Sequence, residues 1–318
     1  MLALIGALLA LAPPAAACHG PGTAAGGVQV WSARPIARGA FAVLLRADFT
    51  QFESLSPDEI EEKTLEVSGD HAHFHVVGHS TLTTLGLQYG LTDNLELAVL
   101  FGYYAATNVG EGHAIGSSSY EFYDYGDIDG LADTWVAAKW RVRMSPGGDV
   151  AVIGGIKAPT GVDDITFDGA PIDQSLQPGS GSWDASLALA FTRELGARAT
   201  LDASAQYVLR TEALDYKVGE QFSAGIAMAM RLVGDMHAAR TLSGFVEVDL
   251  RDLAENEEDG EVFVNSGGTT LFVTPGVHAD LSAHVGASLG LQLPVVQHLN
   301  DVQQEVDYKV TGSVTLTL

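Results

Sequence analysis

Apolar and polar side chains alternate with a period of two along most of this chain. In residues 283–293, one face holds Val285, Ala287, Leu289, Leu291 and Leu293. The other face of this segment holds only histidine, glycine, serine and glutamine. Successive side chains of a β-strand point to opposite sides of a sheet, so this period predicts strands with one apolar and one polar face.

Twelve segments of this kind follow one another: 38–53, 74–90, 94–108, 131–145, 149–159, 182–195, 197–211, 219–233, 240–252, 268–281, 283–293 and 305–318. Most are longer than the about 5–6 residues of soluble strands and reach the about 9–11 that a tilted strand needs to cross a membrane. Tight turns alternate with long loops, which are predicted at 54–73, 109–130, 160–181 and 253–267. We therefore predict an all-β fold, an up-and-down antiparallel transmembrane β-barrel of about 12 strands over residues 38–318.

A soluble β-sandwich would also have alternating strands. It does not account for the length of the strands or for the alternation of short and long connections. The polar faces would form the outer surface of a sandwich, yet these faces are rich in Gly, Ser, Thr and Ala. In a barrel they line the interior and the apolar faces meet lipid, so the barrel is the better interpretation.

The N-terminal residues have the features of an export signal. Residues 1–12 are an apolar run, too short for the about 20 residues of a transmembrane helix, and small residues follow it. We predict a signal peptide at 1–17, a periplasmic segment at 18–37 and a location in the outer membrane of a Gram-negative bacterium. Lipidation of Cys18 is an alternative to plain cleavage.

The chain is acidic, with 40 Asp and Glu against 16 Lys and Arg and a net charge of -24. This balance supplies no basic surface for nucleic acid, and a single cysteine excludes a disulfide framework. Half of the carboxylates lie in the four long loops, where Lys63 is the only basic residue. Most basic residues fall on predicted inward faces instead. Six of them are candidates for contacts with a solute in the lumen: Lys139, Arg141, Arg143, Lys157, Arg198 and Arg231.

Several short motifs stand at the strand ends. Lys157-Ala-Pro-Thr-Gly161 is followed by Gln177-Pro-Gly-Ser-Gly-Ser-Trp183, and further motifs are Gly90-Leu-Thr-Asp-Asn94 and Thr274-Pro-Gly-Val277. On these motifs the chain resembles, over about residues 38–318, the outer-membrane transporter-like β-barrels of the meta-pathway of phenol degradation family. The resemblance implies an exported barrel that passes small, often hydrophobic or aromatic, compounds. Such barrels usually end in Phe or Tyr, whereas this chain ends in Leu318, which keeps the apolar face of the last strand.

We therefore expect an outer-membrane channel for the passive uptake of small molecules. Its expected partners are outer-membrane lipids, the barrel-assembly machinery and the solute, and no nucleic acid. A structural barrel without a pore is an alternative. We do not expect an enzyme, because no Gly-x-Ser-x-Gly motif occurs and the adjacent His79 and Ser80 point to opposite faces of a strand.

Four histidines, His71, His73, His75 and His79, lie within nine residues at the edge of the first long loop. Residues i, i+2 and i+4 of a strand share a face, so three imidazoles can converge on Zn²⁺ or Cu²⁺. No other cofactor is indicated. A metal-binding or metal-transport-associated barrel is therefore a second functional hypothesis, and a His-rich strand end without metal is the simpler alternative.

Overall fold

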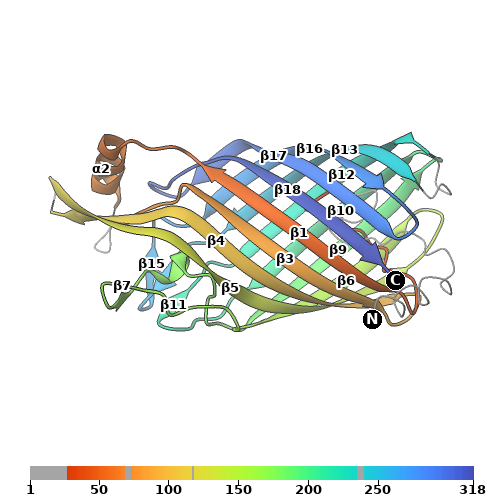
Figure 1. Cartoon of the computed structure of the whole chain (residues 1–318), viewed down its shortest axis with the longest axis horizontal. Helices are drawn as coiled ribbons and strands as arrows, with labels where there is room; N and C mark the ends of the chain where they lie inside the picture. The colour runs from red at the N-terminus through yellow and green to blue at the C-terminus, as the bar shows by residue number, and fades with distance from the viewer. Residues whose placement is uncertain (1–26, 69–72, 117, 235–239) are drawn as a thin grey trace, which may run out of the picture.

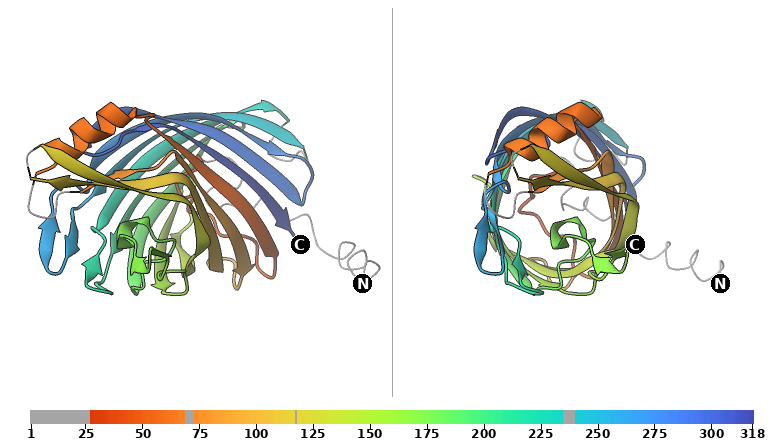
Figure 2. Two further views of the ribbon diagram at one scale, coloured as in Figure 1. Left: turned by 60° about the vertical axis from the view of Figure 1, so that its left-hand side comes forward. Right: turned by 90° about the vertical axis from the view of Figure 1, so that its left-hand side faces the viewer.

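The computed structural model describes residues 27–68, 73–116, 118–234 and 240–318, and its main sheet closes into a barrel (Figures 1 and 2). In the described residues, the barrel is formed by twelve long strands, and each of them lies on one of the twelve predicted segments. The prediction of an antiparallel β-barrel is confirmed. The strands are β1 (Phe41–Phe52), β3 (His79–Gly90), β4 (Leu95–Ile115), β5 (Ser119–Arg143), β6 (Asp149–Ala158), β9 (Asp184–Leu195), β10 (Ala199–Leu209), β12 (Gln221–Val233), β13 (Thr241–Leu253), β16 (Gly268–Asp280), β17 (Val285–Leu299) and β18 (Val306–Thr317).

Each long strand pairs with the long strands before and after it in the chain, and β1 pairs with β18 to close the ring. This last pairing runs along β1 from Ala42 opposite Thr317 to Phe52 opposite Val306. A closed ring leaves no strand edge unpaired, as the membrane interior requires. We call the end with the tight turns and Leu318 the turn end, and the end with α2 and the long loops the loop end (Figure 1).

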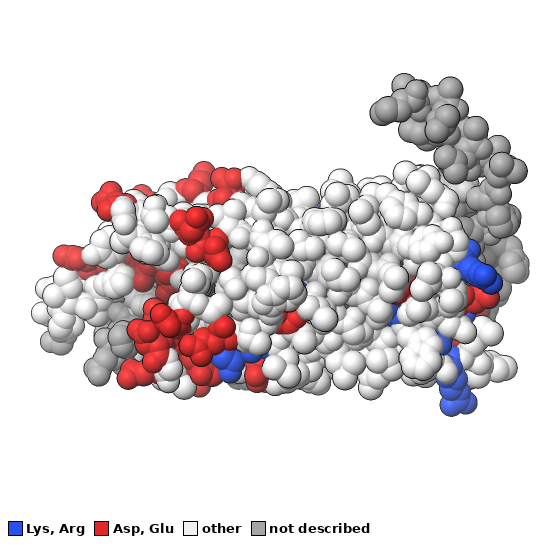
Figure 3. Space-filling model, turned by 90° about the horizontal axis from the view of Figure 1, so that it is seen from below, with Lys and Arg blue, Asp and Glu red and all other residues white. Residues whose placement is uncertain are grey.

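The outer wall of the barrel is apolar, and the inner wall is made of small and polar side chains. On β9, the outward Leu187 and Leu189 are 60% and 57% exposed, whereas the inward Ala188 and Ala190 are each 2% exposed. On the face shown in Figure 3, Asp and Glu gather at the loop end and the middle of the barrel is almost free of charge. Large apolar side chains around a closed barrel are the arrangement that contact with lipid requires.

The loop end has more regular structure than the sequence predicted. The predicted loop 54–73 contains the helix α2 (Pro57–Glu66), which begins with a capping box between Ser56 and Glu59. This helix has few apolar residues, so the sequence shows no helical repeat of apolar side chains there. The predicted loop 109–130 is also wrong, because β4 and β5 continue as a paired ribbon beyond the barrel (Figure 1).

Shorter elements complete the loop end. They are β2 (His73–Val76), which pairs with β4, and β7 (Thr166–Phe167), β8 (Ala170–Pro171), η1 (Gln174–Leu176), β11 (Tyr216–Lys217), β14 (Asn256–Glu258) and β15 (Glu261–Phe263). Across the part of the chain that the structure describes, no helix has the length and apolar character to cross a membrane.

The sequence places residues 18–37 ahead of the barrel, yet the described part of this segment lies inside it. Residues 28–36, which we call the plug segment, occupy the turn-end half of the lumen. Several of their side chains are fully buried, with Val28 and Ala33 at 0% and Ile36 at 1% exposed. The predicted signal peptide at 1–17 and Cys18 lie outside the described residues.

Candidate functional site

Carboxylates of the barrel wall hold the backbone of the plug segment. Glu247 of β13 accepts hydrogen bonds from the N–H groups of Gln29 and Val30, both at 3.1 Å. Glu96 of β4 accepts a hydrogen bond from the N–H of Ile36 at 2.9 Å. A buried backbone without a partner strand needs acceptors of this kind. The wall carboxylates therefore replace strand pairing inside the lumen.

The inner wall also leaves room for the side chains of the plug segment. Arg34 forms ion pairs with Asp149 of β6 and Glu194 of β9, each at 2.7 Å. Ala33 packs in an apolar cluster with Ile153 and three small side chains of the wall, Ala151, Ala188 and Ala190. The small residues on the inward faces thus make space for a second layer of chain.

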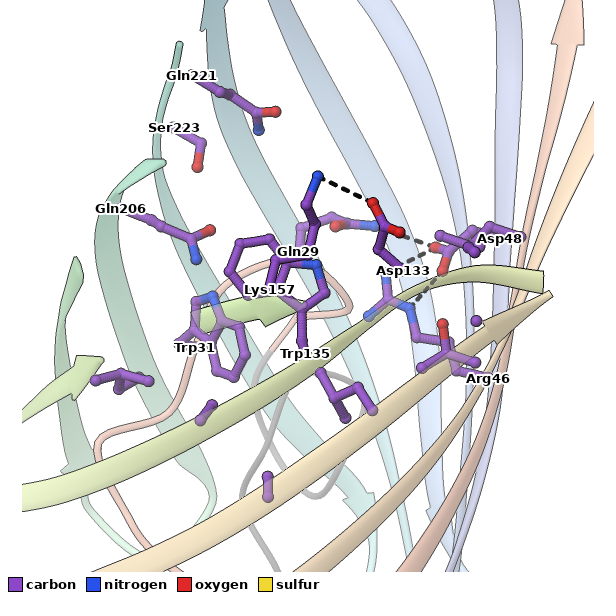
Figure 4. Close-up of a pocket in the computed structure, with 18 of the residues that line it drawn as sticks. Gln29, Trp31, Arg46, Asp48, Asp133, Trp135, Lys157, Gln206, Gln221 and Ser223 are labelled. Carbon is purple, nitrogen blue, oxygen red and sulfur yellow. Dashed lines mark hydrogen bonds and ion pairs between the residues drawn. The ribbon is translucent and has the colours of Figure 1, made fainter. Parts of the chain in front are cut away.

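A cavity of about 540 Å³ lies in the lumen beside the plug segment (Figure 4). The plug contributes Gln29 and Trp31 to its lining, and the barrel wall contributes Trp135 of β5 and Gln206 of β10. At the loop end it is lined by residues of the 160–181 segment, among them Gln177. Pockets for small molecules measure about 300–1,000 Å³, so this cavity has the size for a small solute.

Lys157 of β6 is a buried cation of the cavity wall. Its Nζ lies 3.1 Å from Asp133 of β5 and 2.6 Å from Asp184 of β9. It also donates a hydrogen bond to Ser180. The side chains of Lys157 and Asp133 are each 6% exposed, and that of Asp184 is 0% exposed. Three neighbouring strands are thus joined by one buried ion-pair network.

The same network explains the motif that begins at Lys157 and the motif that ends at Trp183. Asp133 accepts hydrogen bonds from the N–H groups of Gly161 and Ser180, at 2.9 and 3.0 Å. A Cβ atom on Gly161 would lie 2.7 Å from the Cα atom of Gly179. The two ends of this loop are therefore closer together here than any residue other than glycine would allow. The two motifs therefore fold the 160–181 segment over the cavity.

A second group of charges lies on the opposite part of the wall. Arg46 forms an ion pair with Asp48 on β1, at 2.6 Å, and Arg251 forms one with Asp249 on β13, at 2.9 Å. These four side chains also line the cavity. Figure 4 shows Arg46 and Asp48 across the cavity from Gln206. The interior is therefore a wall of paired charges, with no excess of one sign at these positions.

The six basic residues predicted to contact a solute fall into two groups in the structure. Lys139 and Lys157 lie inside the barrel, are 3% and 5% exposed, and line the cavity. The other four belong to the turn end, where Arg141 bonds Asn94 and Arg231 bonds the carbonyl of Ala197. Arg143 and Arg198 are exposed beside the turns.

Two of the four predicted metal-ligating histidines come together at the loop end. His73 and His75 of β2 meet Glu111 of β4 and Asp173 next to η1, and one ligand atom from each lies within 4.8 Å of the others. We call these four residues the loop-end cluster. His79 instead contacts Thr107, at 2.9 Å. His71 lies outside the described residues.

The charges of the loop-end cluster are strongly coupled. Burial alone would raise the pKa of the Asp173 carboxyl, but His75 and His73 outweigh it and hold its pKa well below the usual value. Burial would lower the pKa of His75, but Asp173 and Glu111 raise it above the usual value. The space between these groups therefore favours positive charge.

Several functional residues were not found from the sequence. Glu247 and Glu96 fall on polar faces of alternating strands, but nothing in these strands shows that they bind a backbone. Asp173 lies about a hundred residues from His75 in the chain, and nothing in the sequence connects the two. Trp31 precedes the first strand, where no alternating pattern pointed to the lumen. In each case the contact joins two segments that are not paired as strands.

Fold and site together define a class: a transmembrane β-barrel of the bacterial outer membrane, with an apolar belt towards lipid and a polar, partly filled interior. The chain belongs to the family described as "Putative MetA-pathway of phenol degradation", whose model matches residues 67–292. The resemblance inferred from the motifs and the predicted outer-membrane location are thereby confirmed.

Solved structures share the fold. The chain is similar to an outer membrane channel from Pseudomonas putida F1, with 16% identity, a TM-score of 0.62, and coverage of 90% of this chain and 97% of that one. It is less similar to the CymD monoaromatic hydrocarbon channel, with 10% identity, a TM-score of 0.43 and coverage of 89% of both chains. No curated protein sequence matches this chain.

Proposed function

We propose that this barrel is a passive outer-membrane channel for small molecules. The observation that carries the proposal is the cavity of about 540 Å³ inside the closed barrel, between the plug segment and the 160–181 segment. The outer membrane channel from Pseudomonas putida F1 supports it by fold. A barrel with a merely structural role has no need for a lined cavity along its axis.

The chemistry of the cavity favours a solute with an apolar ring or chain and one or two polar groups. Trp31, Trp135 and Leu100 offer apolar surface, while Lys157 and Gln206 offer donors and acceptors. Because Lys157 is paired with carboxylates, it attracts a charged solute weakly. Small neutral or amphipathic molecules therefore fit better than ions.

Passage past the turn end requires the plug segment to move. Glu247 and Glu96 hold its backbone by hydrogen bonds, which can be exchanged for water as a solute passes. We infer that the plug segment sets the rate and that the cavity sets the selectivity. Insertion of such a barrel also implies contact with outer-membrane lipids and the barrel-assembly machinery.

Liposome swelling tests the proposal with the full-length protein. The solutes are L-alanine and L-phenylalanine, which differ by an aromatic ring. Replacement of residues 28–36 by a Gly-Ser segment of equal length is expected to raise swelling rates for both solutes at least about tenfold, because it removes the packed layer from the lumen.

A second pair of variants tests the cavity. Trp135→Ala removes an aromatic wall of the cavity and is expected to lower the preference for phenylalanine over alanine. Trp140→Ala is the matched control, because Trp140 lies on the same strand and is 58% exposed towards lipid. If neither the wild type nor the plug-replaced protein swells liposomes above the protein-free rate, the barrel is a closed structural one.

A further inference from the structure

The loop-end cluster lies beyond the cavity and has no part in the proposed channel. It consists of two imidazoles and two carboxylates on three separate segments of the chain. We propose that the loop-end cluster binds one divalent transition-metal ion, of which Zn²⁺ fits its ligand set well. The site stands on local geometry and holds whether or not the barrel conducts.

Strand pairing places the first three ligands on one face. β2 and β4 pair so that His75 lies opposite Glu111 and His73 opposite His113. Residues that are directly opposite, or two apart, on paired strands share a face of the sheet. The imidazoles of His73 and His75 are accordingly close, with ring centroids 4.7 Å apart.

Each carboxylate has one oxygen fixed by the protein and the other directed at the imidazoles. In Glu111, Oε2 accepts a hydrogen bond from the Tyr125 hydroxyl at 2.8 Å, and Oε1 lies 2.8 Å from Nε2 of His113 and 4.0 Å from Nε2 of His75. In Asp173, Oδ1 caps η1 by accepting from the N–H of Ser175 at 2.6 Å, and Oδ2 lies 3.5 Å from Nε2 of His75. Carboxylates oriented in this way by further hydrogen bonds are typical of metal sites.

The Nε2 atoms of both imidazoles are buried and face a carboxylate oxygen. Oδ2 of Asp173 lies 3.0 Å from Nε2 of His73, yet within the described residues neither Nε2 atom is accessible to solvent or has the geometry of a hydrogen bond. His73 as a whole is 7% exposed, and its ring packs on Phe263 at a centroid distance of 4.4 Å. A buried nitrogen lone pair that meets no donor is costly unless a ligand engages it.

The donor distances and the ligand types agree with zinc. Around a tetrahedral Zn²⁺ with bonds of about 2.0–2.1 Å, neighbouring donor atoms are about 3.3 Å apart. Oδ2 of Asp173 lies 3.0 Å from Nε2 of His73 and 3.5 Å from Nε2 of His75. Imidazole with carboxylate suits Zn²⁺ better than the all-oxygen sites that Ca²⁺ and Mg²⁺ prefer. One divalent ion also neutralises the two buried carboxylates.

A bound ion would tie the 160–181 segment to the ribbon of β2 and β4. Asp173 directly precedes η1, whose Leu176 packs against Val109 of β4 in the apolar cluster of the loop end. Residues that follow Asp173, such as Gln177, line the cavity. The ion would therefore fix the segment that covers the loop end of the cavity.

Two protonated imidazoles would also neutralise the carboxylates, and this is the explanation that the experiment must separate from metal. Protonated rings would direct their N–H groups at carboxylate oxygens; Nε2 of His73 lies 3.0 Å from Oδ2 of Asp173, although neither Nε2 atom has hydrogen-bond geometry. The two explanations differ in stoichiometry, because only a metal site retains one ion per chain after removal of free metal.

The test uses the full-length protein, purified in detergent without a polyhistidine tag, stripped with EDTA and then titrated with Zn²⁺ in an excess of Mg²⁺. We expect one Zn²⁺ per chain by elemental analysis after desalting. Asp173→Asn keeps the η1 cap but removes the ligand charge, and His75→Gln removes a nitrogen. Both variants are expected to lose stoichiometric Zn²⁺. His79→Gln, a neighbouring histidine outside the cluster, is the matched control and should bind as the wild type does.

Two further measurements guard against misfolding and surface binding. Tyr125→Phe removes only the hydrogen bond that orients Glu111, and it is expected to weaken Zn²⁺ binding about ten- to hundredfold. Zn²⁺ should slow amide hydrogen exchange of residues 172–177 in the wild type and not in Asp173→Asn. The proposal is overturned if the wild type retains no stoichiometric Zn²⁺, or if Asp173→Asn, shown to be folded by its heat-modifiable mobility on gels, binds like the wild type.

Discussion

The two ends of the lumen use the same residue types in opposite ways. At the turn end, Glu247, Glu96 and Asp149 all bind the plug segment, through its backbone or through Arg34. At the loop end, Glu111 and Asp173 face imidazoles, and the Nε2 atoms of His73 and His75 are buried without hydrogen-bond geometry among the described residues. Carboxylates that bind the plug segment stabilise the fold, whereas carboxylates that converge with buried imidazole nitrogens indicate a ligand.

The junction between these regions is the ion-pair network of Lys157. It connects β5, β6 and β9 and, through Ser180, the segment that covers the cavity. On its loop-end side the 160–181 segment leads to the loop-end cluster, and on its turn-end side lies the plug segment. The comparison therefore predicts that structural changes at the junction cost the most stability, those at the plug less, and those of exposed loop charges almost none.

The largest effect is expected for Lys157→Met. The substitution takes the cation from the buried Asp133 and leaves Asp184 with Arg210, at 3.5 Å; breaking a buried pair in this way costs about 3–5 kcal/mol. Unfolding in urea, followed by tryptophan fluorescence in detergent, measures the loss. Lys63→Met is the matched control, because Lys63 pairs with Glu53 at the surface, at 3.7 Å with a 28% exposed side chain, and should change stability by less than about 1 kcal/mol. Equal losses for both variants would contradict a special role of the junction.

A smaller effect is expected for Arg34→Met at the plug. Arg34 is 24% exposed and loses two charge-assisted hydrogen bonds, so we expect about 1–3 kcal/mol after allowance for solvent screening. Because the lost contacts hold the plug segment and not the barrel wall, liposome swelling should rise at the same time. Arg38→Met, an exposed position just after the plug segment, serves as the control and should leave both quantities unchanged. A stability loss without faster swelling would mean that the plug does not set the rate.

The sequence was sufficient to predict the barrel, but not the plug segment inside it or the complete loop-end cluster. A strand such as β9 has a complete alternation from Asp184 to Leu195, and each side chain faces lipid or lumen by position alone. The plug segment has no partner strand, so no period marks it, and its contacts with Glu247 join residues more than two hundred positions apart. The loop-end cluster was half visible, because His73 and His75 share a strand face while Asp173 reaches them only through the fold of a distant loop.

The acidic loops at the loop end provide the last and smallest test of the comparison. Glu61, Glu62 and Glu66 of α2 are exposed, in contrast to the paired carboxylates of the plug. Charges of this kind act only through the field at the mouth, which reaches about 30 Å at 0.01 M salt and about 3 Å at 1 M. In the conducting, plug-replaced protein, the triple change Glu61→Gln, Glu62→Gln and Glu66→Gln should lower the preference for K⁺ over Cl⁻ by less than about twofold at 0.01 M salt, measured as a shift in reversal potential. The shift should vanish at 1 M salt, since screening removes the field of exposed carboxylates but not that of buried ones. A shift that persists at 1 M would place these carboxylates in the conduction path itself, and the two ends of the lumen would then not differ in the way proposed.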